Sequence, residues 1–268
     1  APNMATMLGF ITCDAAVSTG LWHEMLKRAV DQSFNQITVD GDTSTNDCVL
    51  ALANGQSRTT AITENSPNAQ KLERMLTAVC QYLAKAIARD GEGATCLIEV
   101  QVSGAPDDQA ASQVAKTIVG SSLVKSAVFG RDPNWGSIAA AAGRAGAKIH
   151  QDELNIKLGD LVLMRNGQPQ EFDRNAASNY LKAAAAGEYL QQDTVLISVE
   201  IGLGAGTSIA WGCDLTYKYV EINAEYTTWT GLVPSTEDVE HNPQVAAELR
   251  IKKRETQIWL NYYLVIEP

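Results

Sequence analysis

The sequence lacks a long uninterrupted run of apolar residues, and it does not open on a basic segment followed by an apolar one. A membrane-spanning helix needs about 20 consecutive apolar residues, and a secretion signal needs the basic-then-apolar order. We therefore expect no membrane partner and a cytoplasmic location.

Positive charge is also scarce. The 21 Lys and Arg residues are outnumbered by 31 Asp and Glu, and the net charge is −10. Binding to a phosphate backbone relies on clustered positive charge, so nucleic acid is not an expected partner. Hydrophobic residues make up 45% of the 268 positions and charged residues 19%, which is typical of a globular protein with a sizeable core.

Histidine and cysteine are too sparse for the usual catalytic and metal patterns. The three histidines, at positions 23, 150 and 241, are far apart, and the five cysteines include no Cys-x-x-Cys pair. We expect no metal site and no Ser-His-Asp triad. The cysteines are expected to be small buried residues in a reducing compartment.

Two loops resemble ligand sites without meeting their requirements. In the glycine-rich segment 202–206 the third glycine comes one residue too early for a dinucleotide-binding loop. Alternate residues of segment 40–46 are short and polar, as in a calcium loop, but Thr45 and Ala51 stand where Gly and Glu are needed. We expect the side chains of 40–46 to bond to nearby backbone groups instead.

Hydrophobic periodicity predicts an alternation of helices and strands. Apolar residues at helical spacing follow Ser18 and the pair Ser66-Pro67, which are suitable helix caps. Helices are expected over 18–34, 66–89, 106–120 and 175–187, and after 133–136; strands are expected after residue 6 and over 37–40, 96–102, 123–129, 148–172, 194–200 and 207–215, with a hairpin turn at Asn166-Gly167.

Near the start of the chain, Thr6 stands between a small residue and an apolar run. A threonine hydroxyl is a weak nucleophile unless a base lies beside it. Cutting the peptide bond before the threonine supplies that base, because the new α-amine titrates near about 8 and is partly unprotonated at neutral pH. By itself, the pair Ala5-Thr6 is better explained as an ordinary strand start.

The residues around Ala5-Thr6 and four later stretches carry a resemblance. They are APNMATMLGFIT (1–12), VDGDTSTND (39–47), DGEGAT (90–95), DPNWG (132–136), and AWGCDL (210–215) followed by INAEY (222–226). In this order they resemble the ornithine acetyltransferase family, also called glutamate N-acetyltransferase, over residues 1 to about 228.

The resemblance implies a set of site residues. Family members are made as one precursor that cuts itself at an Ala-Thr bond into an α and a β chain. Ala5–Thr6 is then the cleavage site and Thr6 the catalytic nucleophile. Glu92, Asn223 and Thr228 are implied to bind the substrate. A carboxylate such as Glu92 suits the ammonium group of an amino acid.

The resemblance also implies a reaction and a fold. The reaction is transfer of an acetyl group from N2-acetyl-L-ornithine to L-glutamate in arginine biosynthesis. It uses no cofactor, although some members take acetyl-CoA as co-substrate. The implied partner is the α chain, in an α2β2 heterotetramer. The implied fold is α+β, a layered α/β sandwich of the N-terminal-nucleophile-like type.

The sequence departs from the family pattern in three places. The oxyanion hole of the family belongs to the α chain, which is not part of this sequence, and Ser137 replaces a common Arg. Residues 229–268 have no counterpart. We predict that 1–5 end the α-chain region, that 6–228 are the β chain and that 229–268 are an extension. The alternatives are a self-processing aminopeptidase or amidohydrolase, an acetyltransferase of another pathway, or a binding module without activity.

Overall fold

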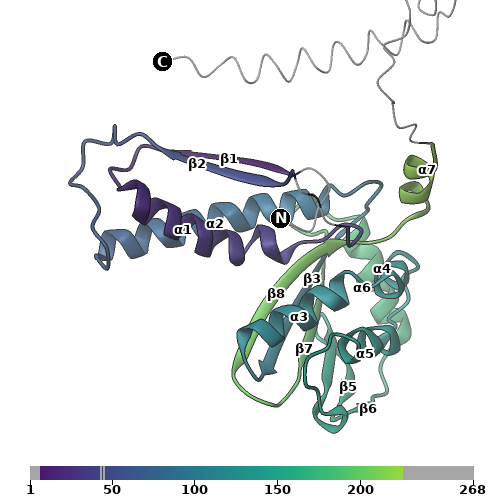
Figure 1. The fold of residues 1–268 in the computed structure, drawn as a ribbon. Coiled ribbons are helices and arrows are strands. Elements are labelled where there is room, and N and C mark those ends of the chain that lie inside the picture. Colours follow the sequence, from purple (N-terminus) through teal and green to yellow (C-terminus); the bar gives the residue numbers. More distant parts are fainter. Residues whose placement is uncertain (1–6, 43, 45, 226–268) are drawn as a thin grey trace, which may run out of the picture. The chain divides into compact units, whose positions relative to one another are not determined.

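The computed structural model describes residues 7–42, 44 and 46–225 (Figure 1). By its internal contacts the chain divides into two units, Ala1–Ala224 and Glu225–Pro268, and the described fold is almost entirely the first. The predicted boundaries after residues 5 and 228 lie outside the described residues and stay predictions.

The elements alternate along the chain. The helices are α1 (Thr19–Asp31), α2 (Pro67–Arg89), α3 (Asp108–Val119), α4 (Ser122–Phe129), α5 (Trp135–Gly143), α6 (Arg174–Ala185) and α7 (Tyr217–Glu225), with 3₁₀ turns η1 (Phe34–Gln36) and η2 (Gln151–Glu153). The strands are β1 (Leu8–Cys13), β2 (Cys48–Ala53), β3 (Leu97–Ala105), β4 (Asn155–Leu158), β5 (Leu161–Arg165), β6 (Gln168–Pro169), β7 (Thr194–Glu200) and β8 (Gly206–Cys213).

Six strands form a mixed sheet in the order β6-β5-β4-β7-β3-β8 (Figure 1). Strands β3 and β7 are parallel, and the other neighbours are antiparallel. Because side chains alternate between the faces of a strand, Ile98 and Val100 of β3 enter one core together with buried residues of α3, α4, α5 and α6. Leu97 points the opposite way and joins a second core with Trp211 of β8.

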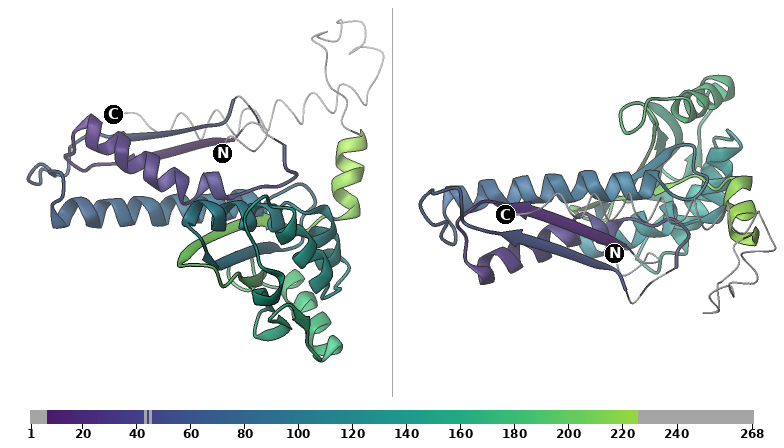
Figure 2. Two further views of the ribbon diagram at one scale, coloured as in Figure 1. Left: turned by 60° about the horizontal axis from the view of Figure 1, so that its bottom comes forward. Right: turned by 90° about the horizontal axis from the view of Figure 1, so that it is seen from above.

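The second core lies under a two-stranded parallel sheet. Strand β1 pairs with β2 in the register Leu8↔Cys48, and buried residues of β1 contact those of α1 and α2. Figure 2 shows the two strands running along these helices. The opposite face of the pair is formed by large apolar side chains, Leu8, Phe10, Leu50 and Leu52, and all four are exposed.

The predicted helix starts and the hairpin are confirmed. The hydroxyl of Ser18 accepts a hydrogen bond from the backbone N–H of Leu21, and that of Ser66 accepts one from Ala69, with Pro67 as the first helical residue. These bonds satisfy amides that have no partner inside the helix. Between β5 and β6, Asn166 and Gly167 both have positive φ, as the hairpin turn requires.

Three predictions about the elements are wrong. Segment 123–129 is helical, because its buried residues Val124 and Val128 are spaced four apart and Leu123 is 68% exposed. Segment 37–40 is not a strand, since it contributes only an isolated bridge from Ile37 to Trp211. The first helix was predicted to run to residue 34 but ends at Asp31. The apolar periodicity extends further because Phe34 is buried in the turn η1 that follows the helix.

The five cysteines all lie in described residues and are unpaired. Cys80, Cys96 and Cys213 are buried, and the other two are half-buried. Burial raises the pKa of the Cys80 thiol to about 11 and that of Cys96 to about 12. Such thiols stay protonated at neutral pH and behave as small apolar side chains. Among the described helices, none is both long and apolar enough to cross a membrane.

Candidate functional site

Two of the predicted substrate-binding residues lie together. The side-chain amide of Asn223 on α7 donates to Glu92 Oε2 at 2.5 Å, although the two residues are 131 positions apart. The same amide donates to the carbonyl of Tyr219 at 2.9 Å. Asn223 therefore lies on a helix, α7. Ala5, Thr6 and Thr228 lie outside the described residues.

Glu92 lies in a tight turn between the end of α2 and β3. A glycine is required on each side of it, because a side chain at either position would collide with a neighbour. A Cβ atom on Gly91 would lie 2.6 Å from Cys213 Sγ. Gly93 has a φ of +70°, and a Cβ there would lie 2.7 Å from Lys218 Cβ on α7. The turn thus packs directly against α7, which carries Asn223.

An ion pair at the end of α2 supports this turn. Arg89, the last residue of α2, forms an ion pair with Asp193, whose side chain is fully buried. Arg89 Nη1 also donates to the carbonyl of Ala94 at 3.3 Å, and Asp193 accepts from the backbone N–H of Leu190 at 2.9 Å. Because a buried charge is costly without partners, these contacts fix the turn relative to β7.

Asp214 holds the other end of the turn. Its carboxylate accepts hydrogen bonds from the backbone N–H of Thr95 at 2.7 Å, the hydroxyl of Thr95 at 2.5 Å and the backbone N–H of Cys96 at 3.3 Å. Arg131 donates to the same hydroxyl at 3.3 Å. The 210–215 motif was recognised in the sequence, but these anchoring roles were not, because the partners are about 118 positions away.

We expect Asp214→Ala to lower the melting temperature strongly. The substitution leaves the half-buried donors of Thr95 and the buried N–H of Cys96 without their acceptor, at up to about 1–3 kcal/mol for each. Each kcal/mol lowers the midpoint by roughly 2–4 °C in a chain of this size. Asp173→Ala is the matched control, since Asp173 also accepts from two backbone amides, of Asn175 and Ala176, but is exposed. A thermal scan showing equal shifts for both variants contradicts the anchoring role.

A third segment, 38–47, reaches the same region. Its polar side chains bond to nearby backbone N–H groups: Thr38 accepts from Gly41, Asp40 from Asp42 and Ser44 from Asn46. This confirms the local bonding expected in place of a calcium loop. Among the described residues no group of three His, Cys, Asp or Glu side chains is placed to hold a metal ion.

Two longer contacts fix the ends of segment 38–47. The ammonium group of Lys125, a residue only 3% exposed on α4, donates to the carbonyl of Val39. At the other end Asp47 Oδ1 accepts from the backbone N–H of Met7 at 2.7 Å. Since Met7 directly follows Thr6 in the chain, this bond fixes the backbone beside the predicted nucleophile.

The charges around α7 are mainly negative. The hydroxyl of Tyr219 lies 3.4 Å from Asp40 Oδ2. Burial and then the nearby carboxylates, with Asp40 the largest contributor and Glu92 and Asp42 adding to it, raise the pKa of Tyr219. Since Glu92 and Asn223 are exposed, an ammonium group arriving from solvent meets a carboxylate and an amide that can accept and donate hydrogen bonds.

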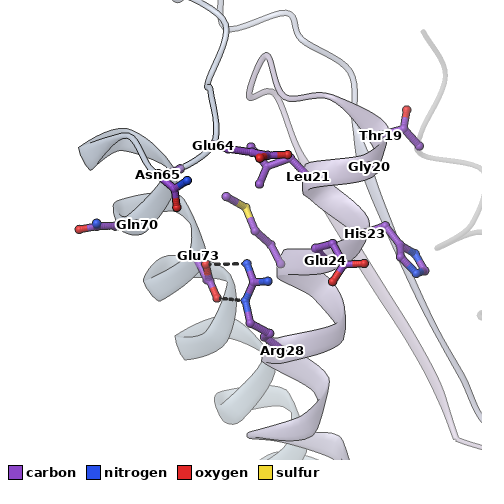
Figure 3. Close-up of a pocket in the computed structure, with 12 residues that line it drawn as sticks. Thr19, Gly20, Leu21, His23, Glu24, Arg28, Glu64, Asn65, Gln70 and Glu73 are labelled. Atoms are coloured by element: carbon purple, nitrogen blue, oxygen red, sulfur yellow. Dashed lines mark hydrogen bonds and ion pairs between the residues drawn. The ribbon is translucent and has the colours of Figure 1, made fainter.

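A separate cavity lies elsewhere. A space of about 750 Å³ opens between α1 and the N-terminal half of α2, where Arg28 makes two bonds to Glu73 at 2.5 and 3.0 Å (Figure 3). Helix α2 has 23 residues and is therefore about 35 Å long. The cavity lies at its N-terminal end, whereas Glu92 follows its C-terminal end. The exposed Arg28–Glu73 pair contributes little to stability, and the cavity contains none of the predicted site residues.

Comparison with known proteins places these residues in a family. Residues 1–228 match the ArgJ family. The "Arginine biosynthesis bifunctional protein ArgJ" of Synechocystis sp. is 74% identical over 227 residues, which are 85% of this chain and 55% of that protein. The chloroplastic protein of the same name from Oryza sativa subsp. indica is 59% identical over 228 residues, 85% of this chain and 48% of that protein.

A solved structure supports the same relationship. The crystal structure of the arginine biosynthesis bifunctional protein ArgJ from Bacillus halodurans superposes with a TM-score of 0.78 at 47% identity. The match covers 82% of this chain and 100% of that one, which confirms the predicted layered α+β fold. The chain spans about half the length of the curated relatives it matches. The resemblance indicated by the motifs is confirmed, and the chain belongs to the ArgJ family.

Proposed function

We propose that the protein is a glutamate N-acetyltransferase, which moves an acetyl group from N2-acetyl-L-ornithine to L-glutamate in arginine biosynthesis. The observation that carries the proposal is the 2.5 Å contact between Glu92 and Asn223, the two described residues to which the family resemblance assigns substrate binding. A carboxylate beside an amide suits an amino acid, because Glu92 accepts from its ammonium group and the Asn223 amide donates to its carboxylate.

The chemistry is two acyl transfers on one hydroxyl. Thr6 Oγ1 attacks the acetyl carbonyl carbon, and the α-amine of Thr6 accepts the hydroxyl proton. The acetyl C–N bond breaks, ornithine leaves with that proton on its amine, and acetyl-Thr6 remains. Glutamate then attacks the ester through its amine, and Thr6 regains its proton as N-acetylglutamate leaves. The free α-amine requires cleavage of the bond between Ala5 and Thr6.

The lengths of the relatives support cleavage. The match covers 55% of the Synechocystis protein but the whole of the solved Bacillus halodurans chain. The solved chain therefore corresponds to only part of a full-length relative, as expected if the full-length protein is cut in two. We propose the same cut here, at Ala5–Thr6.

The exposed apolar face of β1 and β2 supports an α-chain partner. Parallel strands are normally covered on both faces, whereas Leu8, Phe10, Leu50 and Leu52 are exposed in this chain. We propose that the α chain of the same precursor covers them, in an α2β2 heterotetramer, and supplies the oxyanion hole. Loss of a single oxyanion donor costs about 10²–10³ in rate, so the β chain alone is expected to have almost no activity.

The proposed reaction needs no cofactor, because the acetyl group comes from the donor amide itself and the nucleophile is a side chain. Acetyl-CoA as a second acetyl donor is part of the proposal, since some family members use it. A cytoplasmic location is proposed as well, and the unpaired cysteines suit it.

Intact mass spectrometry tests the proposal. This chain is expressed behind the preceding segment of the Synechocystis relative, and its mass is measured before and after N-acetyl-ornithine is added. We expect a chain that starts at Thr6 and gains one acetyl group, which glutamate then removes. An uncut chain, or a cut chain that hydrolyses peptide amides and is never acetylated, contradicts the proposed transfer.

We expect Glu92→Gln to raise the KM for glutamate and for acetyl-ornithine with little effect on cleavage. The change keeps the size of the side chain but removes its charge, and a hydrogen bond to a charged group is worth about 1.5–3 kcal/mol, or roughly 10- to 100-fold in KM. Steady-state kinetics measure it. Glu188→Gln is the control, because Glu188 is an exposed carboxylate outside the site. An unchanged KM in Glu92→Gln contradicts the binding role.

A further inference from the structure

One buried hydroxyl joins the Glu92 turn to helix α7. Thr216 is 5% exposed, and its hydroxyl donates to the carbonyl of Gly93 at 2.9 Å. The same oxygen accepts from the backbone N–H of Lys218 at 3.1 Å and of Tyr219 at 3.4 Å. Thr216 is thus the N-terminal cap of α7 and a tether to the turn at once.

The tether closes a ring of contacts around the site. Glu92 and Gly93 are neighbours in the turn, and they contact α7 at two places. Gly93 meets Thr216 just before the helix, and Glu92 meets Asn223 near its end. Asn223 lies seven residues beyond Thr216, about 10 Å along the axis, so a small rotation at the start of the helix displaces the amide from the carboxylate.

We propose that Thr216 is a positioning residue for substrate binding, which sets the distance between Glu92 and Asn223 by holding α7 to the turn. The inference rests on the proposed acetyltransferase function and names a residue to which the family resemblance gives no role. A hydroxyl is needed because one atom must donate to a carbonyl and accept from amides. A valine fills the same volume and can do neither.

The tether acts on binding more than on chemistry. Thr216 is buried and does not reach the solvent side where Glu92 and Asn223 are exposed. Its own hydrogen bonds go to the turn and to α7; α7 meets segment 38–47 at Tyr219 and Asp40, whereas the bond to Met7 is made by Asp47 at the other end of that segment. Loosening α7 therefore weakens the contacts to the amino-acid part of either substrate and leaves the nucleophile in place.

Three variants test the inference in the complete protein, preceded by the segment of the Synechocystis relative. We expect Thr216→Val to raise the KM for both substrates about 5- to 10-fold, the value of one to two net hydrogen bonds, with kcat and cleavage nearly unchanged. Thr216→Ser keeps the hydroxyl and should restore the KM. Thr117→Val is the control, because its hydroxyl donates only to Gln113 within α3.

A double-mutant cycle separates positioning from general destabilisation. If Thr216 acts through Asn223, Thr216→Val has little further effect on KM in an Asn223→Ala background. Additive effects, an unchanged KM in Thr216→Val, or a loss confined to kcat overturn the inference while the wild type still transfers acetyl. A wild type that is cleaved and folded but transfers no acetyl instead shows that the proposed function is wrong, and the inference fails with it.

Discussion

Replacing Thr6 by alanine is expected to abolish both self-cleavage at Ala5–Thr6 and acetyl transfer. The Thr6 hydroxyl is the only protein group that the proposed mechanism uses as a nucleophile, in the cut and in the transfer alike. Removing the nucleophile of a covalent enzyme costs about 10⁶ in kcat. Gel electrophoresis should show the uncut precursor, and the intact mass should show no acetyl group after acetyl-ornithine is added.

Two further variants make this result specific. Thr6→Ser keeps a hydroxyl beside the future α-amine and should retain slower cleavage and transfer. Thr12→Ala, at an exposed position of β1, should leave both unchanged. Because an uncut chain lacks the free amine, the chain is also expressed from residue 6 beside the preceding segment, so that transfer is measured without the need for cleavage. Normal transfer by Thr6→Ala in either form rules out Thr6 as the nucleophile.

Local signals predicted those parts of the fold that local bonds determine. The serine caps of α1 and α2 and the positive-φ pair at Asn166 and Gly167 each involve residues only a few positions apart. Segment 38–47 belongs in part to the same class, since Thr38, Asp40 and Ser44 each accept from a backbone N–H two or three residues away. Such contacts follow from the sequence alone.

Tertiary contacts decided the places where the prediction failed. The run 123–129 is apolar enough for a strand, but α4 buries Val124, Lys125 and Val128 at helical spacing, and the buried Lys125 bonds to a carbonyl on a distant segment. On α2 the large apolar residues Met75 and Val79 are exposed, while the smaller Cys80 and Ala84 are buried. Small residues at these positions let other elements approach the helix closely.

The candidate site shows the same division. Glu92 and Asn223 were identified through resemblance, since a glutamate between two glycines is by itself an ordinary turn residue. The residues that hold them, Asp214 and Thr216 among them, were missed, because their bonds span more than 100 positions. The pKa of Glu99 also depends on a distant residue. Burial acts to raise this pKa, but hydrogen bonds from Trp211, which is 112 positions away, and from Gln101 and Lys85 hold it below its usual value.

Gly93→Ala is expected to have the second-largest effect, through α7. A φ of +70° costs an alanine roughly 1–2 kcal/mol, and its Cβ would lie 2.7 Å from Lys218 Cβ and 3.0 Å from the Lys218 backbone carbon. A backbone atom cannot rotate away, so the helix itself must move. Since a displacement of about 1 Å can cost 10²-fold in rate, we expect kcat/KM to fall by about that factor.

Matched glycine variants show whether the contact with α7 is the cause. Gly143→Ala is the control, since a Cβ on Gly143 meets nothing within 4 Å, and it should retain full activity. Gly93→Asn is more informative: asparagine tolerates positive φ better than alanine but has the same Cβ. If strain in φ alone mattered, Gly93→Asn would recover most of the activity. We expect instead that both Gly93 variants lose kcat/KM to a similar extent, because either Cβ forces Lys218, and with it Asn223, away from Glu92.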